Sequence, residues 1–231
     1  DEKGCWELQI TTPAASFEEY TLTLTDGEQS VTLQHLLIGE VWLCAGQSNM
    51  VMPLNGFDYC PISDSNNVIA DAPNHPGIRM VTIKPTVKLS PQEYAEGSWQ
   101  QPTTENAPKF SAAAYHYALT LQRTLQIPIG VITCAWGGSR VEGWLPKEIL
   151  QTYKDEDLTL IGSDKTPVYL QSMLMYNGIL YPCHKYTIKG FIWYQGESNV
   201  RNSRTYAERL ATMVKHWRSI WKQGDLPFYY V

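Results

Sequence analysis

Ser48 is the residue whose surroundings in this sequence best suit covalent chemistry. It stands in Gly46-Gln47-Ser48-Asn49, directly after an apolar run that indicates a buried parallel strand. The carboxyl ends of parallel strands are where open α/β sheets bind ligands, and glycine suits the turn that follows. We therefore predict that Ser48 is a nucleophile, faced by the free N–H groups of a helix that starts near Asn49. The alternative is that Ser48 only caps this helix, as serines often do.

Two other polar runs follow predicted strands in the same way. Gly137 and Gly138 come after the apolar run 129–134, and the segment 195–199 follows the run 190–194 with an amide, a carboxylate and a second amide. Acyl transfer through serine needs a nucleophile and hydrogen-bond donors aimed at the developing oxyanion. Glycine suits the donor position because it lets the backbone come close to the substrate. Together the three runs favour acyl transfer more strongly than Ser48 alone.

Alternating strands and helices must position these runs. The sequence predicts strands that end near residue 46 and span 78–83, 129–134 and 190–194, with a fifth beginning at 228. It predicts helices at 111–126 and 205–221 and a mostly helical stretch at 166–180. This alternation indicates an α/β fold with a parallel sheet and helices on both faces. The polar segment 53–76 and the segment 84–109 are expected to be irregular loops.

The first 38 residues are predicted to be β structure. Apolar and polar residues alternate around 6–10, 22–24 and 31–33, and Asp26-Gly27 predicts a hairpin turn because its loop needs positive φ. Two or three strands with one apolar face cannot stand alone. We therefore expect residues 1–38 to be part of a small β domain and residues 39–231 to form the α/β domain.

Composition excludes several classes of function. A net charge of −5 argues against a nucleic-acid partner, because phosphate binding needs a basic face. No apolar run approaches the roughly 20 residues of a membrane span. The five cysteines include no C-x-x-C pair, which disfavours a zinc site or a disulfide framework. We expect no metal and no cofactor.

Three runs of the sequence together carry a resemblance to a known family. They are 41–50, 136–144 and 193–199. In order and spacing they resemble the sialate O-acetylesterases, which belong to the SGNH (GDSL-like) hydrolases, and the likeness extends from about Trp6 to the end of the chain. It implies a flavodoxin-like sheet and a serine esterase that removes O-acetyl groups from sialic acid. The general elbow G-x-S-x-G of α/β-hydrolases is not met, because Met50 stands at its second glycine.

The resemblance implies roles for individual residues. Ser48 matches the nucleophile, and its own N–H would join the oxyanion hole. Gly138 matches the oxyanion glycine, with Gly137 as the runner-up. Gln195 matches the position whose side-chain amide would complete the hole. Asn199 is the runner-up there, because the wider superfamily uses an asparagine.

The predicted substrate-binding residues lie within the same runs. They are Gln47, Asn49, Trp136, Arg140 and Glu197. Trp136 and Trp144 flank the glycines and are candidates for an aromatic wall against a sugar. Arg140 is placed to steer a sugar carboxylate, and the alternative is that it is solvated or paired with Glu142.

The expected general base is missing from these 231 residues. The family takes its base from an Asp-x-x-His pair after the fifth strand, and none of the five histidines follows an aspartate by three residues. We therefore expect an internal fragment that stops within the fifth strand, with the missing carboxyl-terminal segment as its partner. The resemblance suggests a periplasmic, secreted or lysosomal location, although the sequence contains no visible signal peptide.

Three interpretations of function stay open. The leading one is a sialate O-acetylesterase. The same runs suit an acetylxylan esterase or another polysaccharide esterase, a choice that the loops around the substrate would decide. A different class is a carbohydrate-binding fragment that keeps the three runs without a base. The missing histidine is the feature that separates this last class from the enzymes.

Overall fold

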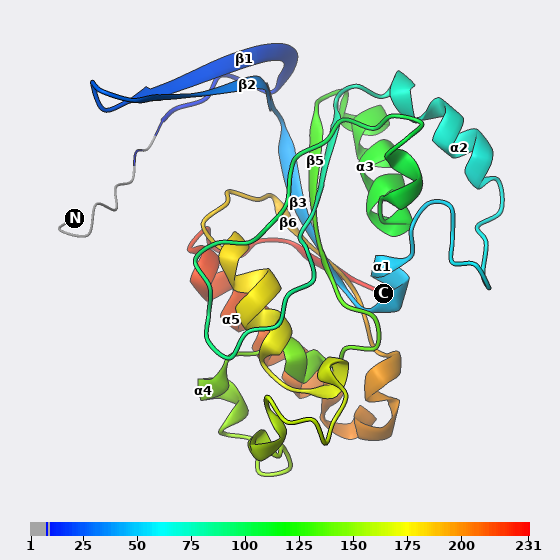
Figure 1. Cartoon of the computed structure of the whole chain (residues 1–231), viewed down its shortest axis with the longest axis vertical. Helices are drawn as coiled ribbons and strands as arrows, with labels where there is room; N and C mark the ends of the chain where they lie inside the picture. The colour runs from blue at the N-terminus through cyan, green and yellow to red at the C-terminus, as the bar shows by residue number, and fades with distance from the viewer. Residues whose placement is uncertain (1–7, 9) are drawn as a thin grey trace.

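Five strands form a sheet at the centre of the computed structural model, which describes residue 8 and residues 10–231 (Figure 1). The strands are β3 (Glu40–Gly46), β4 (Ile78–Thr82), β5 (Ile129–Ala135), β6 (Gly190–Tyr194) and β7 (Phe228–Tyr230). Their order is β4-β5-β3-β6-β7, and every neighbouring pair is parallel. The predicted α/β fold with a parallel sheet is confirmed.

β3 lies in the middle of the sheet, and the chain leaves it in two directions. β4 and β5 lie on one side of β3, whereas β6 and β7 lie on the other. In open α/β sheets the crevice at the strands' carboxyl ends, where the order reverses, is the usual ligand site. Here that crevice lies between the ends of β3 and β6, which lead into Ser48 and Gln195.

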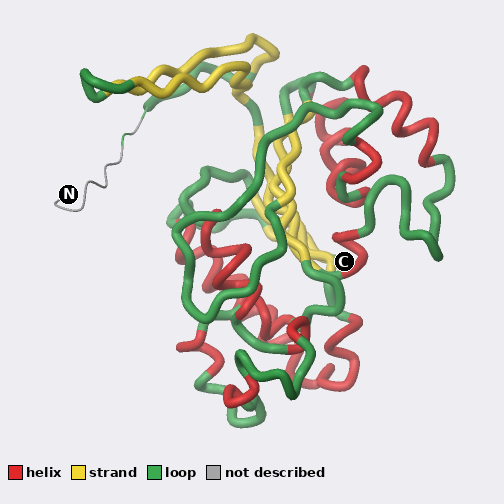
Figure 2. Tube along the Cα trace, viewed as in Figure 1, coloured by secondary structure: helices red, strands yellow, loops and turns green. Residues whose placement is uncertain are grey.

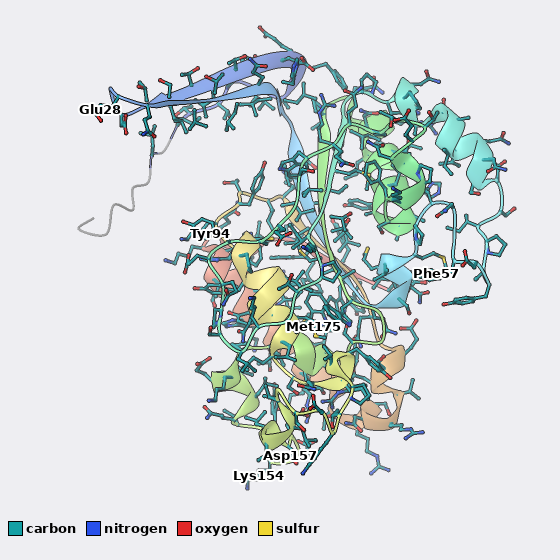
Figure 3. The ribbon with its side chains drawn as sticks, in the orientation of Figure 1. Glu28, Phe57, Tyr94, Lys154, Asp157 and Met175 are labelled. Atoms are coloured by element: carbon teal, nitrogen blue, oxygen red, sulfur yellow. The ribbon has the colours of Figure 1, made fainter. Side chains whose placement is uncertain are left out.

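The sheet separates two hydrophobic cores, because successive residues of a strand point to opposite faces. Leu43 of β3 belongs to the α5-side core, under helix α5 (Ser203–Trp221), whereas Cys44 belongs to the α3-side core, under helix α3 (Ala112–Leu125). Figure 2 shows helices on both sides of the strands. Met175 belongs to the α5-side core and lies in the interior of the molecule (Figure 3).

Large aromatic rings dominate the α5-side core. Trp144, Trp193 and Trp217 are fully buried and meet edge to face, with ring centroids 5.6–6.5 Å apart. The Trp217 ring N–H donates to the Trp144 carbonyl, so its polar atom is satisfied within the core. Such pairs add about 0.5–1.5 kcal/mol beyond the area that they bury.

In the α3-side core, the helix itself presents small residues to the sheet. Ala114 and Ala118 of α3 are fully buried, which lets the helix lie close to the sheet. The helix begins and ends as the sequence predicts: the Ser111 hydroxyl oxygen accepts the Ala114 N–H at the amino end, and Gln126 takes a left-handed conformation (φ 55°) at the other.

Two stretches differ from expectation. The segment 53–76, expected to be a loop, contains α2 (Ser65–Asp71) and a 3-10 turn (Ala72–Asn74). The apolar residues Val68 and Ile69 of α2 are only partly buried, and in a helix of seven residues they give no repeating apolar stripe that would reveal it. The stretch 166–180, expected to be mostly helical, contains a 3-10 turn (Val168–Leu170) and a π-helix (Tyr176–Leu180), and Met173 between them has a positive φ of 71° that interrupts any regular helix.

The remaining helical elements are short. They are α1 (Ser48–Val51), α4 (Lys147–Leu150) and the 3-10 turns Ala107–Lys109, Val141–Trp144, Leu158–Leu160, Tyr181–Cys183 and Glu197–Asn202.

An antiparallel hairpin, β1 (Ser16–Thr25) and β2 (Ser30–Ile38), projects from the α/β body (Figure 1). The predicted turn at Asp26-Gly27 is confirmed: Asp26 Oδ1 accepts two backbone N–H groups of the turn, and Gly27 has φ 97°. Figure 3 places Glu28 at the tip of this hairpin.

The strand expected around residues 6–10 is not found in the part of the chain that the structure describes. Leu8 and Ile10 lie outside any strand, and Trp6 lies outside the described residues.

Candidate active site

Ser48 is the first residue of helix α1, directly after the central strand. Gln47 is the N-cap and Ser48 is not, so the alternative role of Ser48 as a cap is not observed. The N–H groups of Met50 and Val51 donate to the Gln47 carbonyl, whereas those of Ser48 and Asn49 have no carbonyl to reach within α1. Because α1 is a single turn, its dipole is small. Stabilisation of negative charge at Ser48 would therefore come from the individual N–H groups and not from the dipole of a long helix.

Gly46 fixes the position of this turn. Its φ is 152°, and a Cβ there would lie 2.1 Å from the Tyr194 carbonyl oxygen, so only glycine allows β3 and β6 to close up at this edge. The Gln47 N–H donates to the same carbonyl over 3.0 Å. Ser48 is thereby held beside the end of β6.

The second part of the site is the segment 136–141 after β5, here called the donor loop. The Trp136 N–H donates to the Gly46 carbonyl over 3.0 Å, which places the loop next to the Ser48 turn. Within the described residues, neither Gly137 nor Gly138 uses its N–H in a hydrogen bond. The Ser48 turn thus adjoins a loop with two unused backbone donors.

Gln47 was predicted to bind substrate, but the structure gives it a different contact. It is buried, and its Oε1 accepts the Gly196 N–H over 3.2 Å and the Ser198 N–H over 3.3 Å. Its side chain therefore ties the end of β3 to the loop after β6.

Asn49 and Glu197, also predicted to bind substrate, contact one another. Asn49 Nδ2 donates to Glu197 Oε1 over 2.5 Å, across the ends of β3 and β6. Glu197 is exposed and Asn49 is half-buried, so the pair lies at the protein surface.

The side-chain amides of Gln195 and its runner-up Asn199 are bonded to other groups of the protein. Gln195 Nε2 donates both of its protons, to the Ser139 carbonyl over 2.9 Å and to Asn199 Oδ1 over 2.8 Å. Its Oε1 accepts the Tyr206 hydroxyl. The Gln195 amide thus contacts the donor loop at Ser139.

Asn199 is equally committed, to a carboxylate. Its Oδ1 also accepts the Val141 N–H over 2.9 Å, and its Nδ2 donates to Glu142 Oε2 over 3.0 Å. Glu142 is fully buried and is paired with Arg209, whose side chain is 2% exposed. A charge buried this deeply is tolerated only with such partners. Sequence reasoning missed this pair because its members are 67 residues apart.

Arg209 in turn binds further carboxylates. It donates to both oxygens of Asp155 over 2.7 Å each. Burial alone would lower the pKa of Arg209, but the hydrogen bond to Glu142 and the charges of Asp155 and Glu156 outweigh it and raise that pKa. Arg209 therefore stays charged. Through Glu142 and Asn199 it is linked to the donor loop at Val141.

Arg140 does not extend toward a substrate. Its guanidinium donates to Glu156 Oε1 over 2.8 Å and twice to the Leu170 carbonyl, over 2.8 and 3.1 Å. The expected alternative, pairing with a carboxylate, therefore describes it better, although Glu156 is a closer partner than Glu142 at 3.8 Å.

The two tryptophans proposed as a sugar wall are in different positions. Trp144 is fully buried and cannot contact a sugar. Trp136 is half-buried and lines a cavity of about 180 Å³ together with Val51 and Gly137. Of the two, only Trp136 therefore has ring surface that a ligand could contact.

All five histidines lie within the described residues and are engaged elsewhere or point to solvent. His35 pairs with Glu19, His75 with Asp71, His184 with the Tyr181 carbonyl and His216 with the Tyr176 hydroxyl, while His116 is exposed on α3. The Asp71–His75 pair precedes β4, at the opposite edge of the sheet from Ser48. Burial lowers the pKa of His216, which suits its place beside the core.

In the part of the chain that the structure describes, the cysteines form no disulfide and no metal-binding group is found. Cys44, Cys60, Cys134 and Cys183 are free, and burial raises the pKa of Cys44 to about 12. Among the described residues, no three His, Cys, Asp or Glu side chains are grouped so as to hold a metal ion. Nor does that part of the chain contain a helix long and apolar enough to cross a membrane.

Comparison with known proteins gives matches over most of the chain. Residues 38–231 match the family model described as carbohydrate esterase, sialic acid-specific acetylesterase. Proteins named sialate O-acetylesterase from Pongo abelii and from Homo sapiens are each 28% identical over 205 residues, which cover 85% of this chain and 38% of each relative.

A solved structure matches the whole chain. It is the crystal structure of a carbohydrate acetylesterase from Xanthomonas citri, with a TM-score of 0.85, 30% sequence identity and coverage of 100% of this chain and 49% of the other. The chain thus spans less than half the length of these relatives.

Proposed function

This chain belongs to the carbohydrate esterase family of sialic acid-specific acetylesterases, and we propose that the protein is a serine esterase that removes O-acetyl groups from a sugar through Ser48. One observation carries the proposal: Ser48 adjoins a loop with two unused backbone donors, at the edge of the sheet where ligands bind.

In the proposed reaction the Ser48 hydroxyl oxygen attacks the acetyl carbonyl carbon, and its proton passes to a general base. The negative charge that forms on the carbonyl oxygen is met by the N–H groups of Ser48 and Gly138, with Gly137 as a further donor. The ester C–O bond then breaks, and the sugar hydroxyl leaves with the proton held by the base. Water repeats these steps on the acetyl-enzyme and releases acetate.

Gln195 and Asn199 have an indirect role in this proposal. Their amide protons are engaged with Ser139, Asn199 and Glu142, so they fix the donor loop and do not donate to the substrate. This assignment replaces the side-chain donor that the resemblance implies for Gln195.

The general base is proposed to be a histidine that follows the fifth strand, as the family resemblance implies. Four of the five histidines are engaged at other places and His116 is exposed on α3, which supports this. β7 is parallel to β6 and β3, so Val231 lies at the same edge as Ser48. Residues after β7 would therefore enter the site directly.

Sialic acid is the first proposed substrate, because the family model is specific for its acetyl esters. The ion pair of Arg140 with Glu156 supports a second candidate substrate, a neutral acetylated sugar such as acetylxylan. The residue expected to bind the sialate carboxylate already binds Glu156. Acetate release from both esters would decide between them.

The test of the proposed function is Ser48→Ala in the protein that includes the residues after Val231. We expect turnover to fall by up to about 10⁶, the cost of losing a nucleophile in a serine hydrolase. Thermal unfolding should shift by only a few degrees, because the Ser48 hydroxyl holds no hydrogen bond among the described residues. Acetate release should be followed on O-acetylated sialic acid and on an aryl acetate. A variant that keeps a tenth of the rate would remove Ser48 from the mechanism. A protein that binds these sugars without releasing acetate would be the non-catalytic carbohydrate-binding class.

A further inference from the structure

Tyr169 packs directly on the glycine proposed as an oxyanion donor. Gly138 has φ 76°, and a Cβ built on it would lie 2.8 Å from Tyr169 Cδ2 and 3.3 Å from two further ring carbons. The ring therefore lies against the backbone of the donor loop. Even so, Tyr169 is 40% exposed, so part of the ring is open beside the site.

The turn that carries Tyr169 is held in place by the ion pair of Arg140 and Glu156. The neighbouring Leu170 carbonyl accepts two hydrogen bonds from Arg140, and Arg140 is fixed by Glu156. Gln171, which is buried, donates to the carbonyls of Ser163 and Thr166. A ring on such a turn is already ordered, so little conformational entropy is lost when a ligand covers it.

We propose that Tyr169 is the platform on which the sugar ring of the substrate packs, an inference that rests on the proposed esterase function. An ester whose carbonyl oxygen is bound by the Gly138 N–H carries its sugar one bond beyond the ester oxygen, within reach of a ring that touches Gly138. Aromatic faces suit the apolar C–H face of a sugar. The ligand class is therefore a pyranose with an exposed C–H face, and the platform itself requires no negative charge on the sugar.

Tyr169→Ala tests this inference through the difference between two esters. We expect kcat/KM for O-acetylated sialic acid to fall about threefold to tenfold, the usual contribution of an aromatic contact. The value for ethyl acetate, which has no ring, should stay within about twofold. Tyr169→Phe keeps the ring and should retain activity on both esters. Tyr94→Ala is the matched control, because Tyr94 is 89% exposed and lies on the separate segment 84–109 (Figure 3).

An equilibrium binding measurement separates failure of the platform from failure of the esterase. Binding of N-acetylneuraminic acid is titrated in the Ser48→Ala protein, with and without Tyr169→Ala. Weaker binding without Tyr169, together with no acetate release from the protein that keeps Ser48, would overturn the esterase and leave the platform standing. Acetate release with equal losses on both esters, or with no loss on either, would overturn the platform alone. No sugar binding at millimolar concentration together with no selective loss would also overturn the platform.

Discussion

The two halves of the candidate site are anchored in different cores. The turn that carries Ser48 belongs to the α3-side core, where Met50 and Leu54 are fully buried. The donor loop belongs to the α5-side core through Val141, and the turn that follows it buries Trp144 in the same core. The nucleophile is thus held by apolar packing, whereas the donors are held by large rings and buried charge.

This difference indicates how each half responds to change. Apolar packing loses stability gradually, in proportion to the volume that is removed. A buried ion pair that loses one partner leaves an uncompensated charge. The donor loop should therefore be the more fragile half. Gln47 and Asn49 are side chains that join the end of β3 to the loop after β6.

Glu142→Gln should break the donor half with the largest effect. The substitution keeps the shape but removes the charge opposite Arg209, and breaking a buried pair costs about 3–5 kcal/mol. Unfolding should occur about 6–20 °C lower, at roughly 2–4 °C per kcal/mol for a chain of this size. Well below that temperature, kcat should fall by roughly 10²–10³ with little change in KM, as when an oxyanion donor is lost.

Glu148→Gln is the control for this prediction. Glu148 is an exposed carboxylate on α4, on the same side of the sheet, and its substitution should change neither quantity. A Glu142→Gln protein with lowered stability and unchanged kcat would mean that the buried charge does not position the donors.

Gln195→Ala should have a smaller effect. It distinguishes a residue that positions the donor loop from one that donates a hydrogen bond directly to the oxyanion. Loss of its bonds to Ser139 and Asn199, at about 1 kcal/mol each, should lower kcat roughly tenfold to a hundredfold and also lower the unfolding temperature. A direct donor would give a larger fall in kcat, roughly 10²–10³, at unchanged stability. Gln223→Ala, which removes a glutamine bonded to the backbone of Ile188, controls for the loss of such an amide. A large fall in kcat at unchanged stability in Gln195→Ala would instead identify Gln195 as an oxyanion donor.

The sequence allowed the frame of the site to be predicted well. Buried strands have continuous apolar runs, and the turns after them need glycine, so the ends of β3, β5 and β6 were visible without a structure. Parallel pairing then brings Ser48 and Gly138 to one edge. These statements depend only on local pattern and on the rules of sheet topology.

The directions of polar side chains could not be predicted in this way. Whether the Gln195 amide faces a substrate or Ser139 depends on partners far away in the sequence, and the same holds for Arg140 and Glu156. Tyr169 was missed because its segment was expected to continue a helix, whereas it forms a separate turn. Long-range contacts decide such details, and residue spacing does not record them.

The most direct test of the account is covalent labelling of the nucleophile. The protein, including the residues after Val231, is treated with an alkyl fluorophosphonate, which phosphonylates an activated serine, and its peptides are mapped by mass spectrometry. The account predicts one adduct, on the peptide that contains Ser48, and none in Ser48→Ala. An adduct on Ser139 or Ser198 instead, or continued acetate release from a protein fully labelled at Ser48, would contradict it.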